Sequence, residues 1–153
     1  MRKFGEALYF VALCGWIGGL WVIGYVVAPV LFSSLSDRQL AGVVAGKLFA
    51  LIGWIGLVCG LYLLGFLLAR RGGRALATPT FWAVLIMLGL TAVSQFGIQP
   101  LMVQLKADAL PKDVMESVLR DRFVTWHGIS SILYLIQSLC GLGLVATAPR
   151  GLK

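Results

Sequence analysis

The sequence predicts an all-α integral membrane protein, a bundle of four transmembrane helices, on the basis of its composition and its hydropathy. Hydrophobic residues make up 59% of the chain and charged residues 12%, with a mean hydropathy of +0.93. Apolar stretches occupy residues 8–32, 48–69, 80–105 and 126–148. Each is continuous rather than alternating and is long enough to cross a hydrocarbon core of about 30 Å as a helix. Spans and loops use up the chain, so we expect a single transmembrane domain over residues 1–153.

The first apolar stretch resembles a signal peptide only in part. Arg2 and Lys3 precede it, as basic residues precede a signal sequence. However, the apolar run is longer than the core of a signal peptide, and no small-x-small cleavage site follows it. We therefore expect the first span to be retained.

The connection to the second span carries a helix-start signal. Ser36-Asp37-Arg38-Gln39 has the form of a capping box, with Ser36 as the N-cap and Gln39 at the third helical position. We expect a helix to begin near Asp37 and to run into the second span as a short amphipathic segment. The short, glycine-rich loop 70–79 predicts that the second and third spans are antiparallel neighbours.

A similar segment is predicted before the fourth span. Pro111 suits the first position of a helix, where an N–H group is not needed. The apolar residues after it have helical spacing, which predicts an amphipathic face leading into the span. These residues are Val114, Met115, Val118, Leu119 and Phe123.

The two halves of the chain resemble each other. Pro29 closes the first span and Pro100 the third, an offset of 71 residues, while Lys47 and Asp121 open the second and fourth at an offset of 74. Each half would then be a span, an outer amphipathic segment and a span. Two such hairpins with the same orientation would be related by an axis along the membrane normal. The alternative is that any two helical hairpins share these general features.

The basic residues predict an orientation with both termini inside the cell, because Lys and Arg in short loops stay on the cytoplasmic side. Arg70, Arg71 and Arg74 crowd the short loop after the second span, and Arg2 and Lys3 precede the first. We expect a multi-pass protein of the bacterial inner membrane, N-in and C-in. The net charge of +7 then serves orientation and contact with the anionic lipid bilayer, and not nucleic-acid binding. Arg150 and Lys153 are also assigned inside, whereas Arg38, Lys47, Lys106, Lys112, Arg120 and Arg122 are assigned outside with every acidic residue except Glu6.

Small residues predict close helix packing in the first two spans. Gly15 and Gly19 form a small-xxx-small pair in the first span. Such faces let helix backbones approach closely, within one chain or across a homodimer, and both alternatives stay open. The second span carries a longer face of this kind: Gly42, Gly46, Ala50, Gly53, Gly56 and Gly60.

Polar residues in the spans predict a cavity. A stripe at helical spacing begins at His127, the only histidine, and continues through Tyr134 and Gln137. Facing lipid would be costly for such a stripe, so it should face the bundle, where the third span offers further polar groups. We expect an outward-facing polar cavity for a small solute; the alternative is that these groups hydrogen-bond one another and hold the bundle together. The expected lining residues are Lys47, Gln95, Gln99, His127, Ser130 and Ser131.

Metal and catalytic signatures are weak. Soft metals such as Cu(I) favour sulfur ligands, and the candidates for a metal site are His127, Cys14, Met87 and Cys140, without the spacing of a metal motif. One histidine is thin support for haem, which commonly has two axial side chains in such bundles. The sequence has no Walker loop, no HExxH motif and no paired carboxylates inside a span. We expect no cofactor and no enzymatic activity.

Several segments resemble a known family. The Arg122-Phe123 pair with the His127-Gly128-Ile129-Ser130-Ser131 run is the most specific, and Gly15–Trp21, Leu31–Leu35, Gly46–Phe49 and Gln99-Pro100 accompany it. The chain thereby resembles the transmembrane protein 205-like family, a four-span group whose bacterial members are catalogued as a domain of unknown function. The resemblance implies metal or drug export, since eukaryotic members are associated with resistance to platinum drugs. It favours functional positions at Lys47, Gln99, Pro100, Phe123, His127, Ser130 and Ser131, although Gln99 stands where relatives are expected to have an acid.

Three functions therefore stay open. We favour a transporter or channel-like protein for an ion or small solute, with a metal as one option. The first alternative is a non-catalytic membrane scaffold or partner-binding protein that dimerises through the glycine faces. The second is a haem- or copper-binding membrane protein.

Overall fold

Each of the four apolar stretches forms a long helical run in the computed structural model of the chain, which describes residues 2–110 and 114–151. All four runs are long and apolar enough to cross a membrane, which confirms the predicted all-α integral membrane fold. The runs extend beyond the predicted spans at most ends, because hydropathy marks only the part that is apolar. The elements are α1 (Arg2–Val22), η1 (Ile23–Val27), α2 (Ala28–Ser34), α3 (Arg38–Arg71), η2 (Gly72–Ala77), α4 (Pro79–Val93), η3 (Ser94–Ile98), α5 (Gln99–Ala109), η4 (Val114–Glu116) and α6 (Arg120–Gly151).

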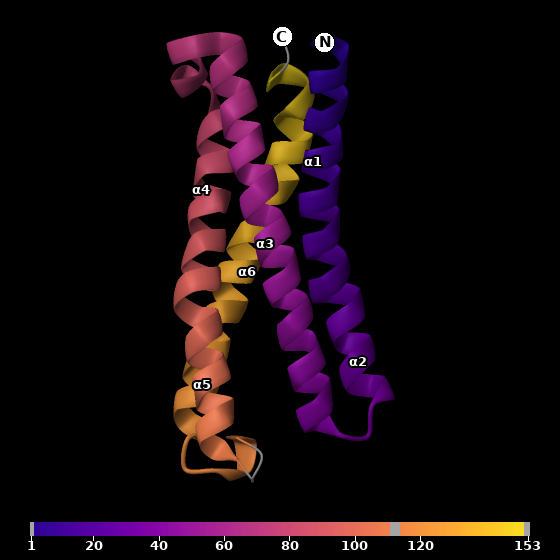
Figure 1. Cartoon of the computed structure of the whole chain (residues 1–153), viewed down its shortest axis with the longest axis vertical. Helices are drawn as coiled ribbons and strands as arrows, with labels where there is room; N and C mark the ends of the chain where they lie inside the picture. Colours follow the sequence, from indigo (N-terminus) through magenta and orange to yellow (C-terminus); the bar gives the residue numbers. More distant parts are fainter. Residues whose placement is uncertain (1, 111–113, 152–153) are drawn as a thin grey trace.

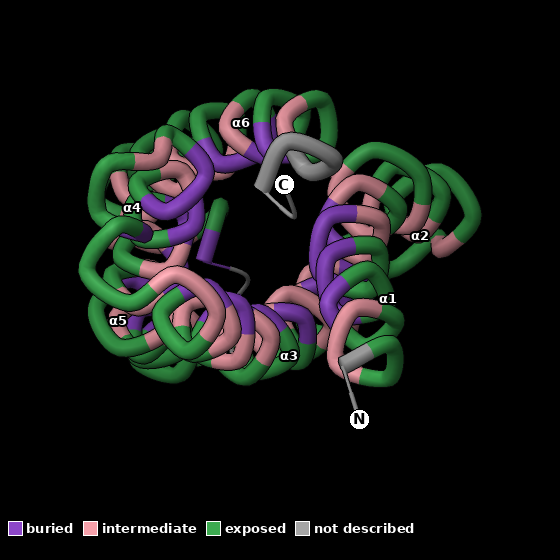
Figure 2. The backbone as a smooth tube through the Cα atoms, turned by 90° about the horizontal axis from the view of Figure 1, so that it is seen from above, coloured by how far each residue is buried: buried purple, intermediate pink, exposed green. Residues whose placement is uncertain are grey.

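The helices form two hairpins that run in the same direction. Both chain termini and η2 lie at one end of the bundle, the terminal end, and the other two connections lie at the opposite end, the loop end (Figure 1). The first hairpin comprises α1, η1, α2 and α3, and the second comprises α4, η3, α5 and α6. Seen along the bundle, the order is α1, α3, α4 and α6 (Figure 2). Since α3 packs on both α1 and α4, the second and third spans are antiparallel neighbours, as predicted.

The core of the bundle lies toward the terminal end, where glycines of α3 receive the indole of Trp16. A Cβ atom on Gly60 would lie 3.0 Å from Trp16 Cη2 and 2.8 Å from Leu88 Cδ1, and one on Gly56 would overlap the indole. Gly19 of α1 likewise faces Ile52 of α3. These glycines therefore pack within the chain. Around them lie the buried residues Tyr9, Leu63, Leu67, Phe81, Val84, Met87 and Leu144.

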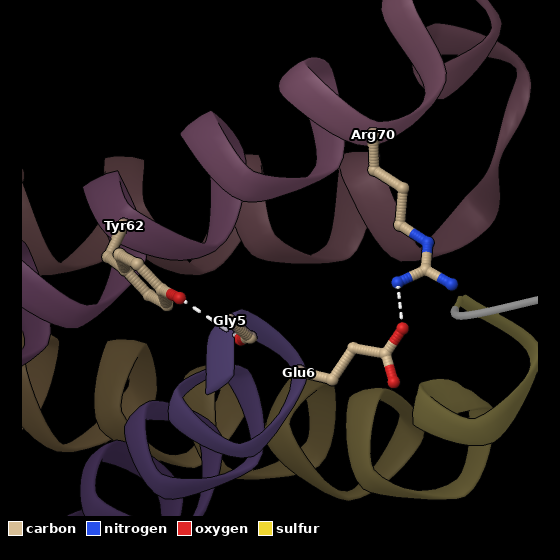
Figure 3. A network of polar contacts seen from close by, with 4 residues as sticks. All are labelled: Gly5, Glu6, Tyr62 and Arg70. Atoms are coloured by element: carbon tan, nitrogen blue, oxygen red, sulfur yellow. Dashed lines mark hydrogen bonds and ion pairs between the residues drawn. The ribbon is translucent and has the colours of Figure 1, made fainter. Parts of the chain in front are cut away.

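Polar contacts fasten α1 to α3 at the terminal end (Figure 3). The Tyr62 hydroxyl donates a hydrogen bond to the Gly5 carbonyl over 3.1 Å. Arg70 Nη1 donates to Glu6 Oε1 over 2.5 Å, and the same guanidinium lies 6.0 Å from the centre of the Phe66 ring. Arg70 thus belongs to α3 and helps to hold the first hairpin together.

A π-helical turn interrupts the first helix of each hairpin. A proline lacks an N–H group and its ring displaces the carbonyl four residues earlier, which disfavours regular α-helix there. Before Pro29, the N–H of Ala28 donates to the carbonyl of Ile23, five residues back, and before Pro100 the N–H of Gln99 donates to Ser94 in the same way. Ile23 and Ser94 are separated by 71 residues (23 to 94), the same offset as the prolines. The first helices of the two hairpins therefore share this backbone feature, whereas the segments before α3 and α6 differ.

The N-cap of α3 differs from the prediction. Asp37, not Ser36, is the cap: its Oδ1 accepts hydrogen bonds from the N–H groups of Gln39 at 2.9 Å and Leu40 at 3.1 Å. The negative charge of a carboxylate at this position also interacts favourably with the positive end of the helix dipole, whereas an uncharged hydroxyl does not. The expectation of a helix that begins near Asp37 and continues into the second span is confirmed.

The segment before α6 is less helical than predicted. Within residues 114–119, the described part of this segment, only the single 3-10 turn of η4 forms, and α6 begins at Arg120. The Ser117 side chain accounts for the break, because its hydroxyl donates to the Val114 carbonyl and accepts from the Leu119 N–H in place of helical bonds. Val118 is 99% exposed, so the expected continuous apolar face is wrong. The predictions made for Pro111, Lys112 and Lys153 lie outside the described residues.

Candidate functional site

A cavity of about 1230 Å³ lies between the two hairpins. It runs from Arg38 and Glu116 at the loop end to Trp16 and Gln137 near the middle of the bundle. The cause is visible in the backbone, because the hairpins pack together at the terminal end and diverge toward the loop end (Figure 1). Its volume exceeds the roughly 300–1,000 Å³ of pockets for drug-sized ligands.

Most of the predicted lining residues do line this cavity. Gln95, Gln99, His127, Ser130 and Ser131 are all among its walls. They come from η3, α5 and α6, so the polar side chains of the second hairpin converge on one space. The periodicity argument, in which polar groups turn away from lipid, placed them correctly.

Lys47 is the exception, and Lys106 takes the place that was predicted for it. Lys47 is exposed and does not line the cavity, although its neighbour Gly46 does. Lys106 of α5 lines it, and its Nζ donates a 2.9 Å hydrogen bond to the Gly42 carbonyl of α3 and lies 5.7 Å from the centre of the Phe123 ring. Lys106 was assigned to an outer loop because it follows the last residue of the apolar stretch, whereas the helix continues to Ala109.

The deeper polar groups of the cavity are satisfied by the protein itself. Gln137 Nε2 donates to Thr91 Oγ1 over 2.6 Å, and Thr91 donates in turn to the Met87 carbonyl over 2.8 Å. Gln95 Nε2 donates to the Ala50 carbonyl over 3.3 Å, and the Tyr134 hydroxyl donates to the Leu20 carbonyl. Both of these last bonds join the second hairpin to the first. At this depth the alternative of polar groups that hold the bundle together is the better description.

Nearer the loop end, polar side chains are available to a ligand. Within the described part of the chain, the side chains of Gln99, His127 and Ser130 make no hydrogen bond. The His127 ring stacks on Phe123 with the ring centres 5.9 Å apart, which fixes the plane of the ring but leaves both nitrogens unengaged. Ser131 is different, because its hydroxyl donates to the His127 carbonyl within α6.

The two hairpins contribute unlike walls. Apart from Arg38 and Gln39 at the loop end, the first hairpin presents mainly glycine, aliphatic and aromatic side chains. The second hairpin presents the amides, hydroxyls, His127 and Lys106 among its own apolar groups. The cavity is therefore amphipathic across its width. The wall from the first hairpin includes Leu20, Gly24, Phe32, Val43, Gly46, Phe49, Ile52 and Gly53.

The four weak metal candidates do not face one space. His127 lines the cavity, whereas Cys14, Met87 and Cys140 do not. Cys14 is exposed on the outside of the bundle, and Met87 is fully buried in the core with Cys140 packed beside it. Among the described residues, no group of three or more His, Cys, Asp or Glu side chains could hold a metal ion. The arrangement thus gives no support to a soft-metal layer.

Comparison with known proteins gives a family without an activity. The family model described as Domain of unknown function (DUF4149) matches residues 11–111, about two thirds of the chain. The chain belongs to this family. The match begins within α1 and ends after α5, so the cavity residues of α6 lie beyond it. No curated protein and no solved structure matches the chain. Its resemblance to the transmembrane protein 205-like family stays a prediction.

Proposed function

We propose that this protein is a small non-enzymatic transporter or channel-like protein that binds a solute in the cavity between its hairpins. The observation that carries this proposal is the cavity of about 1230 Å³ in which the side chains of Gln99, His127 and Ser130 make no hydrogen bond with the described residues. Polar groups inside a membrane domain are costly, and they commonly mark a substrate or ion pathway.

The orientation proposed from the basic residues places both termini in the cytoplasm of a bacterium. The loop end would then face the outside, and the cavity would open outward. Arg70, Arg71 and Arg74 near the terminal end support this orientation, because basic residues in short loops remain on the cytoplasmic side.

The scaffold alternative receives less support. Gly56 and Gly60 face Trp16, and Gly53 leaves room for the Gln95 side chain, so this glycine face of α3 is occupied by the chain itself. A partner would have to use another surface of the bundle.

Solute permeation into liposomes that contain the purified protein tests the proposal. Stopped-flow light scattering would follow swelling in gradients of glycerol, urea, potassium chloride and ammonium chloride. Ser130→Trp should fill the cavity and return permeation to the rate of empty liposomes, and His127→Ala should lower it. Ile132→Trp is the matched control, because Ile132 is an exposed residue of the same helix outside the cavity wall. Permeation no faster than in empty liposomes for all four solutes, or equal loss in both Trp variants, would contradict the proposal.

A further inference from the structure

The position of the cavity in the bilayer follows from the charged residues of α3. Lys47 is exposed on a helix surrounded by exposed apolar residues such as Leu51 and Trp54. A lysine there extends its charge to the headgroup layer. Arg70 lies 23 residues further along the helix (47 to 70), or about 35 Å, which matches a hydrocarbon core of about 30 Å crossed with a modest tilt. The level of Lys47 is therefore the boundary between headgroups and hydrocarbon at the loop end.

The end of the cavity on the headgroup side of this boundary is cationic. Arg38 lies nine residues before Lys47 on α3, and Lys106 reaches Gly42, which also precedes it. Among the residues that the structure describes, Glu116 of η4 is the acidic residue that lines the same end. His127, Gln99 and Ser130 add hydrogen-bonding groups that the described protein leaves unengaged. An anionic group bound there would accept charge-assisted hydrogen bonds from both hairpins.

The end of the cavity on the hydrocarbon side suits an apolar chain. Leu20, Phe49 and Ile52 of the first hairpin and Ile98 of the second line this part. The polar groups at the same depth, Gln95, Tyr134 and Gln137 among them, already donate their hydrogen bonds to protein acceptors. An apolar chain can therefore lie beside these groups without breaking their hydrogen bonds.

The side of the bundle between α2 and α6 gives lateral access from the bilayer. These two helices lie apart at the loop end, and α2 packs on α3 and η1 (Figures 1 and 2). Tyr25, Val124 and Leu135 line the cavity and yet are 52%, 49% and 53% exposed. Apolar side chains border the opening, as expected for a passage that faces lipid.

We propose that the ligand of this cavity is an anionic amphiphile, a lipid with a negatively charged headgroup held by Arg38 and Lys106 and an apolar chain laid against the wall of the first hairpin. This names the substrate class for the cavity and so rests on the proposed function. The ligand enters sideways between α2 and α6, with its headgroup at the level of the bilayer headgroups. The charged headgroup therefore does not cross hydrocarbon when the lipid enters the cavity.

Binding of two lysolipids with equal chains to the full-length protein tests this assignment. Native mass spectrometry of the detergent-solubilised protein would compare lysophosphatidylglycerol, which is anionic, with lysophosphatidylcholine, which is zwitterionic. The anionic lipid should bind at least about tenfold more tightly, because a hydrogen bond to a charged group is worth that factor or more. In Arg38→Gln/Lys106→Gln the ratio should fall close to one, and in Lys47→Gln, which removes an exposed lysine of α3 outside the cavity, it should stay as in wild type. Glutamine at position 106 keeps a hydrogen-bond donor for the Gly42 carbonyl. If the double variant does not fold, Arg38→Gln alone, at an exposed residue, is measured in its place.

Two results would overturn the assignment of an anionic lipid, and both can be told apart from a failure of the proposed transport function. Equal binding of the two lysolipids by the wild-type protein would show that charge does not select the ligand. An equal loss of preference in Lys47→Gln would show that the preference comes from the protein surface. In either case, permeation that Ser130→Trp blocks would leave the proposed function standing. Conversely, anionic preference that Ser130→Trp abolishes, together with no permeation, would keep the lipid site and remove the transport function.

Discussion

The two hairpins of this protein share a backbone plan but are held together by different interactions. In the first, glycines of α3 take up the Trp16 indole of α1, so close packing joins the two helices. In the second, a buried hydrogen bond from Gln137 to Thr91 joins α6 to α4. Each hairpin nevertheless begins with a helix that contains a π turn before a proline. The two hairpins thus share this backbone feature, while the first supplies a mainly apolar wall of the cavity and the second most of its polar groups.

The largest effect is expected from Gly56→Leu, which attacks the packing of the first hairpin. A side chain at this position would overlap the Trp16 indole, and overpacking a tight core typically costs about 1–3 kcal/mol, with more where the backbone must shift. Thermal unfolding in detergent, followed by fluorescence, should show a large drop in melting temperature or loss of folded protein.

Gly65→Leu is the matched control for this substitution, because Gly65 is an exposed glycine of the same helix with no atom within 4 Å of its Cβ position. A variant Gly56→Leu with an unchanged melting temperature but a changed oligomeric state would favour the homodimer alternative over packing within the chain.

An intermediate effect is expected from Gln137→Leu, which removes the hydrogen bond that joins α4 to α6 in the second hairpin. Interhelical hydrogen bonds in membrane proteins are worth about 0.6–2 kcal/mol, and Thr91 would keep its bond to the Met87 carbonyl. The melting temperature should fall by a few degrees. Thr147→Val serves as control, since the Thr147 hydroxyl bonds only within α6. A Gln137→Leu protein as stable as wild type would mean that packing holds the second hairpin too.

The smallest effect is expected from Glu6→Gln, which weakens the ion pair with Arg70 at the terminal end of the first hairpin. Both side chains are partly exposed, at 23% for Arg70 and 32% for Glu6, and such pairs contribute about 0–1 kcal/mol. The loss should shrink further in high salt, because salt screens exposed charges. Denaturant unfolding at two salt concentrations measures it. A loss as large as that of Gly56→Leu would show that electrostatics, and not packing, dominates this hairpin.

The sequence predicted the four spans and five of the polar residues that line the cavity, because both follow from one rule, the cost of polar groups in lipid. That rule placed Gln95, Gln99, His127, Ser130 and Ser131 correctly. It failed for Lys47 and Lys106, since a long lysine near a span end can reach headgroups from any face of its helix. Lys106 also follows η3, and a π turn rotates all later residues relative to an uninterrupted α-helix, which hydropathy does not reveal.

The segments that connect the helices at the loop end were harder to predict than the spans. Ser36 and Asp37 are both good N-cap residues, and the capping-box pattern pointed to Ser36, whereas the structure has Asp37 in that role. The segment 114–119 has apolar residues at helical spacing, yet Ser117 bonds to its neighbours and interrupts the helix. In both cases, hydrogen bonds between a side chain and the nearby backbone determine where the helix begins.

The short connection η2 joins the two hairpins at the terminal end, so a rotation of one hairpin relative to the other would pivot there. The first helical run of the second hairpin extends from Pro79 to Ala109, 31 residues, or about 46 Å of helix from η2. A rotation of about 5° at η2 would displace the far end by about 4 Å at this rise per residue, while side chains near the Trp16 core would move only a fraction of that. Such a rotation would therefore be largest at Arg38 and Lys106 and smallest beside Trp16, where the core holds the protein together.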